Sequence, residues 1–104
     1  QAASVGAHAL VRLHEMQRRH RVIGDVRGRG LLIGLDLVQD RDSKEPADDV
    51  AEAVLYRALD LGLSFKTTMG NVLTLTPPLT TTKSQMDDAL NILDRALSET
   101  TSVS

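Results

Sequence analysis

The sequence is 104 residues long, 41% hydrophobic and 25% charged, with a formal net charge of -2 at pH 7. A chain of this length forms one domain around a single modest core, and with one Phe, one Tyr and no Trp that core must be aliphatic. The absence of cysteine excludes disulfides, a thiolate nucleophile and Cys-based zinc sites, and no apolar run is long enough to span a bilayer.

The N-terminal third of the sequence is basic. Residues 1–30 contain six Arg, against only Glu15 and Asp25. Nucleic-acid binding would suit such an asymmetry, but no aromatic residues are interleaved with the arginines and no winged or zinc motif is present. We therefore expect no nucleic-acid partner, and instead a solvated helix face or a surface that meets another part of a longer chain.

Both ends of the sequence bear on domain organisation. Gln1 is not a Met, and a helical pattern begins at once, so we expect a fragment of a longer protein. The first residues lack the charged-then-apolar layout of a signal peptide, which favours a soluble protein of the cytoplasm. Residues 99–104 are expected to form a disordered tail.

An apolar stripe with helical spacing predicts an amphipathic helix that reaches about His20. A short strand is expected over 23–26, a turn at Gly28 and Gly30, and a longer strand over 31–38. Alternate residues of the longer strand share one face: Ile33, Leu35 and Leu37.

A second helix is expected after the polar loop 39–45. Pro46 fits the first helical position, where a backbone N–H is not needed. The apolar stripe behind it comprises Val50, Ala51, Val54, Leu55, Ala58 and Leu59. Gly62 supplies the expected stop.

Two β-prone segments, 63–67 and 72–76, predict an antiparallel hairpin. The Gly70-Asn71 pair favours a turn between them, and Pro77-Pro78 ends the ladder because neither residue donates a backbone hydrogen bond.

The segment TKSQ, Thr82 to Gln85, matches a capping box and begins a third helix. Its apolar stripe comprises Met86, Ala89, Leu90, Leu93 and Leu97.

The order helix, strand, helix, hairpin, helix predicts a single two-layer α+β domain, a sandwich with helices on one face of a small, mainly antiparallel sheet. If Leu73 and Leu75 face the helices, Thr74 faces away from them. Lys66 lies opposite to Phe65 by the same parity, so Lys66 and Thr74 are expected to share a polar face.

The glycines of VRGRGLLIGLDLV look like a nucleotide-binding loop but lack its spacing. That fingerprint is G-x-G-x-x-G between a strand and a helix, whereas Gly34 follows Gly30 after three residues, within a strand. We expect Gly34 to leave room for a close neighbour. Arg27 and Arg29 either bind an anion or solvate the turn and pair with acids of a neighbouring segment.

Other candidate sites also lack a required part. His8, His14 and His20 are spaced by six, which spreads them around a helix, so we expect surface histidines and no metal site. The acids between 40 and 49 lack the Gly and Glu of a calcium loop, and no G-x-S-x-G elbow presents a nucleophile. We therefore expect no catalytic residue in this chain.

Two segments, VIGDVRGRGLLIGLDLV and LGLSFKTTMGNVLTLTPPLTTTKSQMDDALNILDRAL, resemble the C-terminal small domain of class III aminotransferases. These pyridoxal-phosphate enzymes include the 4-aminobutyrate and ornithine aminotransferases, and the resemblance covers about residues 5–98. It implies a fold-type I enzyme that moves an amino group between an amine or amino acid and a 2-oxo acid or aldehyde. It also implies a homodimer.

The resemblance further implies that a separate large domain supplies the Schiff-base lysine and most cofactor contacts. Lys44, Lys66 and Lys83 lie in no context similar to that lysine, so we expect this chain alone to bind no pyridoxal phosphate and to be inactive.

In this family the small domain shapes the substrate side of the cleft. Many members have, at the position of Thr74, an Arg that grips a substrate carboxylate. Because Thr supplies no fixed positive fork, either Lys66 holds the carboxylate or the donor has none there. Thr74 and Lys66 are therefore the predicted substrate-binding residues.

Two other functions fit the pattern of elements alone. The first is a free-standing ferredoxin-like module that binds or senses a small ligand, and the second is an oligomerisation module that uses the basic first helix. Such folds host many functions, so the linear motifs favour the aminotransferase reading.

Overall fold

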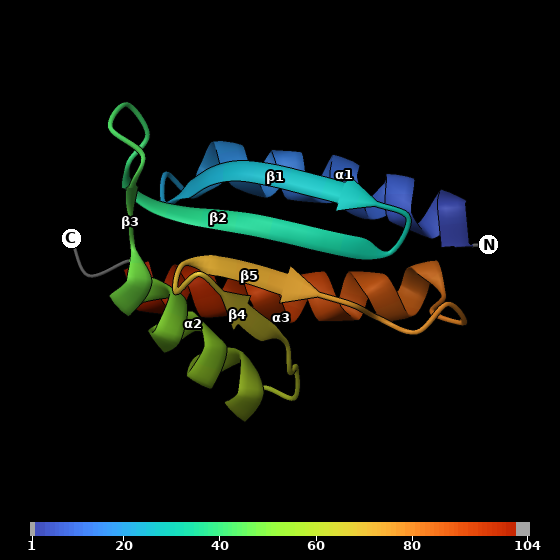
Figure 1. Cartoon of the computed structure of the whole chain (residues 1–104). Helices are drawn as coiled ribbons and strands as arrows, with labels where there is room; N and C mark the ends of the chain where they lie inside the picture. The colour runs from blue at the N-terminus through green and yellow to red at the C-terminus, as the bar shows by residue number, and fades with distance from the viewer. Residues whose placement is uncertain (1, 102–104) are drawn as a thin grey trace.

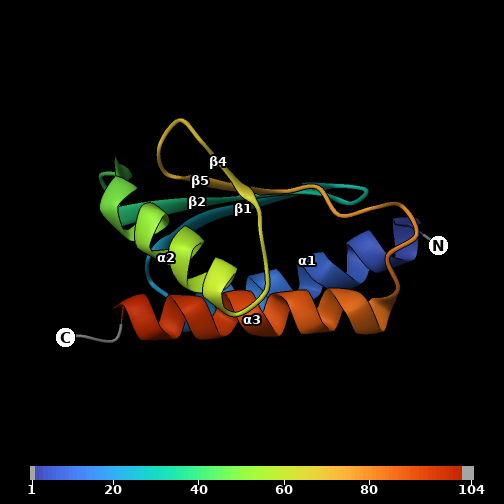
Figure 2. The same cartoon turned by 90° about the horizontal axis from the view of Figure 1, so that it is seen from below.

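Three helices cover one face of an antiparallel sheet in the computed structural model, which describes residues 2–101 (Figure 1, Figure 2). In chain order the elements are α1 (Ala2–Arg19), β1 (Ile23–Arg29), β2 (Leu32–Asp40), β3 (Glu45–Pro46), α2 (Asp48–Asp60), β4 (Lys66–Thr68), β5 (Val72–Leu75) and α3 (Lys83–Thr101). The strand order is β1-β2-β5-β4, with β3 paired to one end of β2. The predicted two-layer α+β architecture is confirmed.

The core between the two layers is aliphatic. Ile33, Leu35 and Leu37 are buried, which confirms the alternation predicted for β2. Fully buried side chains from the other elements meet them: Leu13, Met16, Val54, Leu73, Leu90, Leu93 and Leu97. Leu59 of the predicted α2 stripe is exposed instead, because it lies at the outer edge of that helix.

β1 is longer than the predicted strand 23–26. Its ladder with β2 continues to the pair Arg29 and Leu32, so Gly28 is a strand residue and not a turn residue. Gly30 alone of the two glycines takes the turn conformation, with φ +60. Cross-strand hydrogen bonding, which a local pattern does not reveal, carries β1 through the glycine.

Pro46 does not begin the second helix, as the sequence had predicted. With Glu45 it forms the short strand β3, where Pro46 pairs with Val38, and α2 starts at Asp48. Proline is tolerated in such a position because a short edge strand leaves some N–H groups without a ladder partner.

The β4–β5 hairpin is shorter than predicted, and its turn, residues 69–71, contains the predicted Gly70-Asn71 pair. Met69 and Gly70 have positive φ, 56 and 84, and Asn71 hydrogen-bonds to Leu37 of β2. The backbone N–H of Leu37 donates to the Asn71 carbonyl at 2.9 Å, and the Asn71 side-chain amide donates to the Leu37 carbonyl at 3.0 Å. Asn71 therefore joins the start of β5 to β2.

The predicted capping box of α3 is confirmed. The Thr82 N–H donates to the Gln85 side-chain oxygen at 3.0 Å, and the Gln85 N–H donates to the Thr82 hydroxyl at 3.1 Å. The helix continues to Thr101, so the prediction of a disordered tail is wrong for residues 99–101. Hydroxyls of the last turn bond to helix carbonyls there. The rest of that tail, 102–104, lies outside the described residues.

Charged side chains join α1 to α3, and several of the basic residues of the N-terminal third take part in these contacts. Arg12 donates to Asp87 at 3.1 Å, and Arg19 donates to Asp94 at 3.0 Å. His20 is only 7% exposed, and its Nε2 lies 2.6 Å from Asp94. The prediction of a surface histidine is therefore wrong for His20, because the end of α1 turns it against α3.

α1 crosses the β1–β2 turn at Gly6. A Cβ at this position would lie 2.1 Å from the carbonyl oxygen of Gly30, which is backbone and does not move aside. Gly6 therefore allows the helix to pack directly on the turn.

We predict that Gly6→Ala lowers the free energy of unfolding by about 1–3 kcal/mol, because the new methyl group overpacks this contact. Helix propensity alone would raise stability by about 0.5–1 kcal/mol, so the sign separates the two effects. Urea unfolding measures the change, with Ala7→Gly on the exposed face of α1 as the control for propensity. A Gly6→Ala protein that is more stable than the unmodified chain would contradict the contact.

Asp94 should make stability depend on acid pH. Burial raises the pKa of Asp94, but hydrogen bonds from His20 and Arg19 outweigh it and hold the pKa below its usual value. A carboxyl with a lowered folded-state pKa stabilises the protein above the unfolded pKa of about 3.9, and this stability is lost as pH falls through the folded value.

Asp94→Asn is expected to cost about 1–3 kcal/mol at neutral pH and to flatten the decline in stability below about pH 4. Unfolding curves from pH 7 to pH 3 measure both effects. Asp88→Asn, on the exposed side of the same helix, is the control. Parallel acid declines for Asp94→Asn and the unmodified chain would show that Asp94 is not responsible.

Candidate functional site

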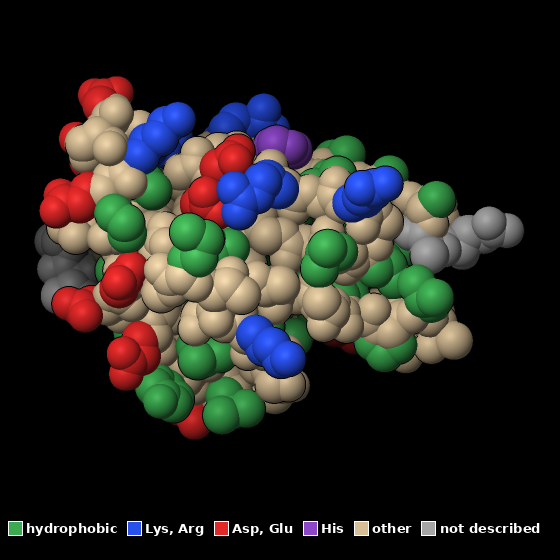
Figure 3. Space-filling view, in the orientation of Figure 1, with side chains coloured by type: hydrophobic (Ala, Val, Ile, Leu, Met, Phe, Trp, Pro, Cys, Tyr) green, Lys and Arg blue, Asp and Glu red, His purple; other side chains and the backbone are tan. Residues whose placement is uncertain are grey.

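The sheet face that points away from the helices carries a row of residues from one edge to the other. Arg27 pairs with Gly34, Gly34 with Thr74, and Thr74 with Lys66. Residues paired across antiparallel strands have their side chains on the same face, so the expected shared face of Lys66 and Thr74 is confirmed. We call this surface the open face; Figure 3 shows basic, acidic and apolar side chains mixed on it.

An ion pair occupies the β1 end of this row. The Arg27 guanidinium donates to both carboxylate oxygens of Asp36, at 3.0 and 2.6 Å, and lies 3.6 Å from Asp25. Of the two roles left open for Arg27, the structure supports pairing with neighbouring acids. Arg29 makes no ion pair within residues 2–101, so an anion can reach it.

Thr74 and Lys66 occupy the other end of the row. Lys66 is exposed and has no ion-pair partner in the described part of the chain, whereas Thr74 is half-buried. The Thr74 hydroxyl lies 3.3 Å from that of Thr68. A lysine ammonium attracts an anion as a point charge, and a threonine hydroxyl adds one hydrogen bond. Together they can bind a carboxylate, but not with the geometry of an arginine fork.

A hollow of about 300 Å³ lies on the open face between these two ends, and we call it the Gly34 hollow. Gly34 of β2 has no side chain to fill it. The lining draws on four strands and their ends and includes Arg27, Leu32, Gly34, Thr68, Val72 and Thr74.

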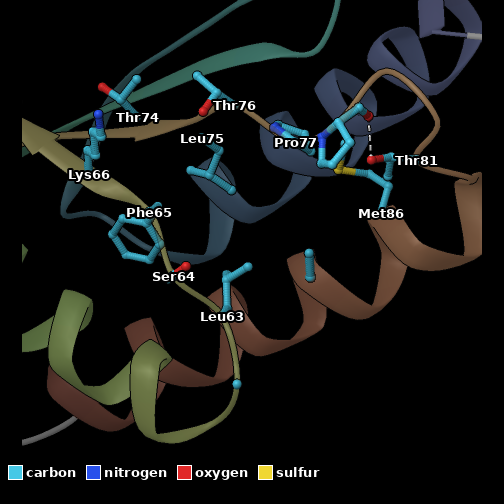
Figure 4. Close-up of a pocket in the computed structure, with 13 residues that line it drawn as sticks. Leu63, Ser64, Phe65, Lys66, Thr74, Leu75, Thr76, Pro77, Thr81 and Met86 are labelled. Carbon is cyan, nitrogen blue, oxygen red and sulfur yellow. Dashed lines mark hydrogen bonds between the residues drawn. The ribbon is translucent and has the colours of Figure 1, made fainter.

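A second hollow, of about 500 Å³, lies where β4 and β5 diverge (Figure 4). Lys66 and Thr74 lie close together on the open-face side, and Leu75 points the opposite way. Thr81 closes the far loop by donating its hydroxyl to the Pro78 carbonyl at 2.6 Å. The apolar part of the lining comprises Leu63, Phe65, Leu75, Pro77, Pro78, Met86 and Ala89. Thr74 lines both hollows, so it stands at their junction.

The lysines of this chain do not fit a covalent pyridoxal-phosphate site. Lys44, Lys66 and Lys83 are all exposed, and Lys44 lies on a loop with φ 59. A lysine that forms a Schiff base is activated by desolvation or by a neighbouring cation.

Among residues 2–101, no three His, Asp or Glu side chains are grouped as a metal ion would require. Among the helices of these residues, none has both the length and the hydropathy of a bilayer-spanning segment.

The sequence predicted the shared face of Thr74 and Lys66 and the alternation along β2, but not which residues of the other strands lie beside them. Gly34 and Asp36 alternate with the buried residues of β2, and they pair with Thr74 and Val72 of β5. The register of two strands far apart in sequence supplies this information. The only local signal was a glycine within a strand, at Gly34.

Comparison with known proteins places these features in a family. Residues 1–97 match the family described as Aminotransferase class-III. A leucine/methionine racemase from Thermococcus litoralis is 47% identical over 98 residues, which is 94% of this chain and 22% of the racemase. An Arabidopsis thaliana mitochondrial alanine–glyoxylate aminotransferase 2 homolog is 37% identical over 100 residues, 94% of this chain and 21% of that protein. The chain thus spans about a fifth of the length of the curated relatives it matches.

Solved structures agree with this similarity. The omega transaminase from Pseudomonas jessenii, in complex with PMP, superimposes with a TM-score of 0.89 at 29% sequence identity. The superposition covers 97% of this chain and 22% of the transaminase chain. The fold-type I assignment of the domain is confirmed.

The Arg27–Asp36 pair should be coupled energetically, but weakly, because Arg27 is 54% exposed. A double-mutant cycle with Arg27→Ala and Asp36→Ala is expected to give about 0.5–1 kcal/mol in urea unfolding, and less in 1 M salt. The helical pair Arg95 and Glu99 provides the control, with about 0.3–0.5 kcal/mol. Zero coupling at low salt would mean that Asp36 does not hold Arg27 in place.

Proposed function

Because the chain belongs to the class-III aminotransferase family, we propose that it is the C-terminal small domain of a longer pyridoxal-phosphate-dependent enzyme. This proposal is supported by the length of the match, because the chain is similar to only about a fifth of each relative. In the proposed enzyme this chain is a single domain, and a separate large domain provides the lysine that carries the cofactor.

The proposed role of this domain is to shape the substrate side of the cleft. One observation carries it: Lys66 and Thr74 pair across β4 and β5 on a sheet face that the helices leave uncovered. Thr74 lines two hollows, and Lys66 lines the larger one; both hollows have polar and apolar walls, as small-molecule sites commonly have.

When bound, pyridoxal phosphate supplies the electron sink for chemistry at the amino-bearing carbon. The residues of this chain bind and orient the substrate. Lys66 attracts a carboxylate on the donor or on the 2-oxo acid acceptor, and the Thr74 hydroxyl donates one hydrogen bond to it. The three exposed lysines support the proposal that the chain alone holds no cofactor and is inactive.

The proposed reaction is transfer of an amino group between an amine or amino acid and a 2-oxo acid or aldehyde. The relatives are named as an aminotransferase and as a racemase of leucine and methionine, and both names support an amino acid as substrate. The 4-aminobutyrate or ornithine subtype, the homodimer and the cytoplasmic location stay predictions. No observation favours a free-standing binding or oligomerisation module.

Thr74→Arg in the full-length enzyme tests the substrate role. The new guanidinium adds a charge-assisted hydrogen bond, so kcat/KM for a carboxylated donor should rise about 10- to 100-fold relative to that for an uncharged amine. Lys66→Ala should shift the ratio the other way. Steady-state kinetics with both donors measures it.

Thr74→Met is the matched control, because it adds length without charge. An unchanged ratio in Thr74→Arg would remove Thr74 from the substrate site. If Lys66→Ala also leaves the ratio unchanged, neither residue contacts the carboxylate.

A further inference from the structure

Gly34 differs from the other glycines of this chain. All seven glycines lie in the described residues, and six of them either have positive φ or lie in crowded positions. Three have positive φ: Gly30, Gly62 and Gly70. For three others, a Cβ would lie less than 3.0 Å from atoms of the chain: Gly6, Gly24 and Gly28.

The fold places neither demand on Gly34. Its φ lies outside the left-handed range, and the nearest atom to a Cβ would be a guanidinium nitrogen of Arg27, at 3.7 Å. The next residue, Val72, would be 3.9 Å away, which is ordinary van der Waals contact. Glycine weakens a strand because it packs no side chain, and it often marks a place where a ligand approaches closely. The hollow that Gly34 lines, which no side chain of this chain fills, thus has room for a group from outside this chain.

The residues that line the Gly34 hollow indicate the chemistry of the group that fits it. Arg27 is held by Asp36 and Asp25, so its charge is already neutralised within the chain. Val72 is apolar, and Thr74 and Thr68 are uncharged. Arg29, the other cation of the lining, pairs with Leu32 and therefore lies one row beyond Gly34. On the β1 side of Gly34, the paired row therefore contains no unpaired charge. This favours an uncharged group above Gly34.

We infer that Gly34 forms the floor of a subsite for the uncharged side chain of the amino donor, and that the missing Cβ sets the size of donor the enzyme accepts. This inference rests on the proposed function, because it assigns the open face to the substrate. The hollow, at about 300 Å³, has roughly ten times the volume of a water molecule in the liquid. It adjoins Thr74, so a donor held by Thr74 and Lys66 can extend its side chain toward Gly34.

The test uses the full-length enzyme and aliphatic donors of rising side-chain length: alanine, 2-aminobutyrate and norvaline. Gly34→Ala and Gly34→Val are compared with the unmodified enzyme. The loss in kcat/KM should grow with donor length, by about tenfold or more for each methylene group that no longer fits. Alanine should be affected least. The melting temperature of Gly34→Ala should not fall, because the methyl group has room.

Gly24→Ala is the matched control. Its Cβ would press on the Val38 side chain at 2.8 Å, outside the Gly34 hollow. It should lower the melting temperature and leave the ratio of kcat/KM between norvaline and alanine unchanged.

Three results would overturn the inference. An equal loss of kcat/KM for every donor would show that a fixed part of the enzyme fills the hollow. A donor ratio that stays unchanged in Gly34→Val, in an enzyme that still acts on all donors, would remove the subsite but leave the proposed function standing. If the unmodified enzyme acts on none of these donors nor on uncharged amines, the proposed function fails, and the subsite fails with it.

Discussion

The pairing of β2 with both β1 and β5 is the constraint on which the two faces of this domain depend. On one side of β2, Ile33, Leu35 and Leu37 are buried against the helices. On the other side, Gly34 and Asp36 lie on the open face. Because side chains alternate along a strand, one register places the aliphatic core and the candidate site back to back. A slip of one residue would exchange them.

Ion pairs form on both sides of the sheet, among the helices and on the open face. On the helix side, acids of α3 pair with Arg12 and Arg19 of α1 and with His20, which follows α1. These pairs hold the two helices together. On the open face, Arg27 is committed to Asp36, whereas Lys66 makes no ion pair within residues 2–101. Arg29 also makes no ion pair there, but Lys66 is the cation that lies beside Thr74, where the family resemblance implies substrate contact.

Local patterns predicted the elements well where packing agreed with them. The α3 capping box and the alternation of β2 needed only neighbouring residues, and both are confirmed. The predictions failed where a distant partner decided the outcome. Pro46 belongs to a strand because it pairs with Val38. His20 is buried because it contacts Asp94 of α3.

The sequence by itself determined the fold class, the family and the shared face of Thr74 and Lys66, because periodicity, turn residues and strand parity are local properties. Only the tertiary structure determined which residues of the other strands surround Thr74. The Gly34 hollow and the Arg27–Asp36 pair arise from the register of strands that are far apart in the chain. That register is set by burying the whole core at once, and no single segment encodes it.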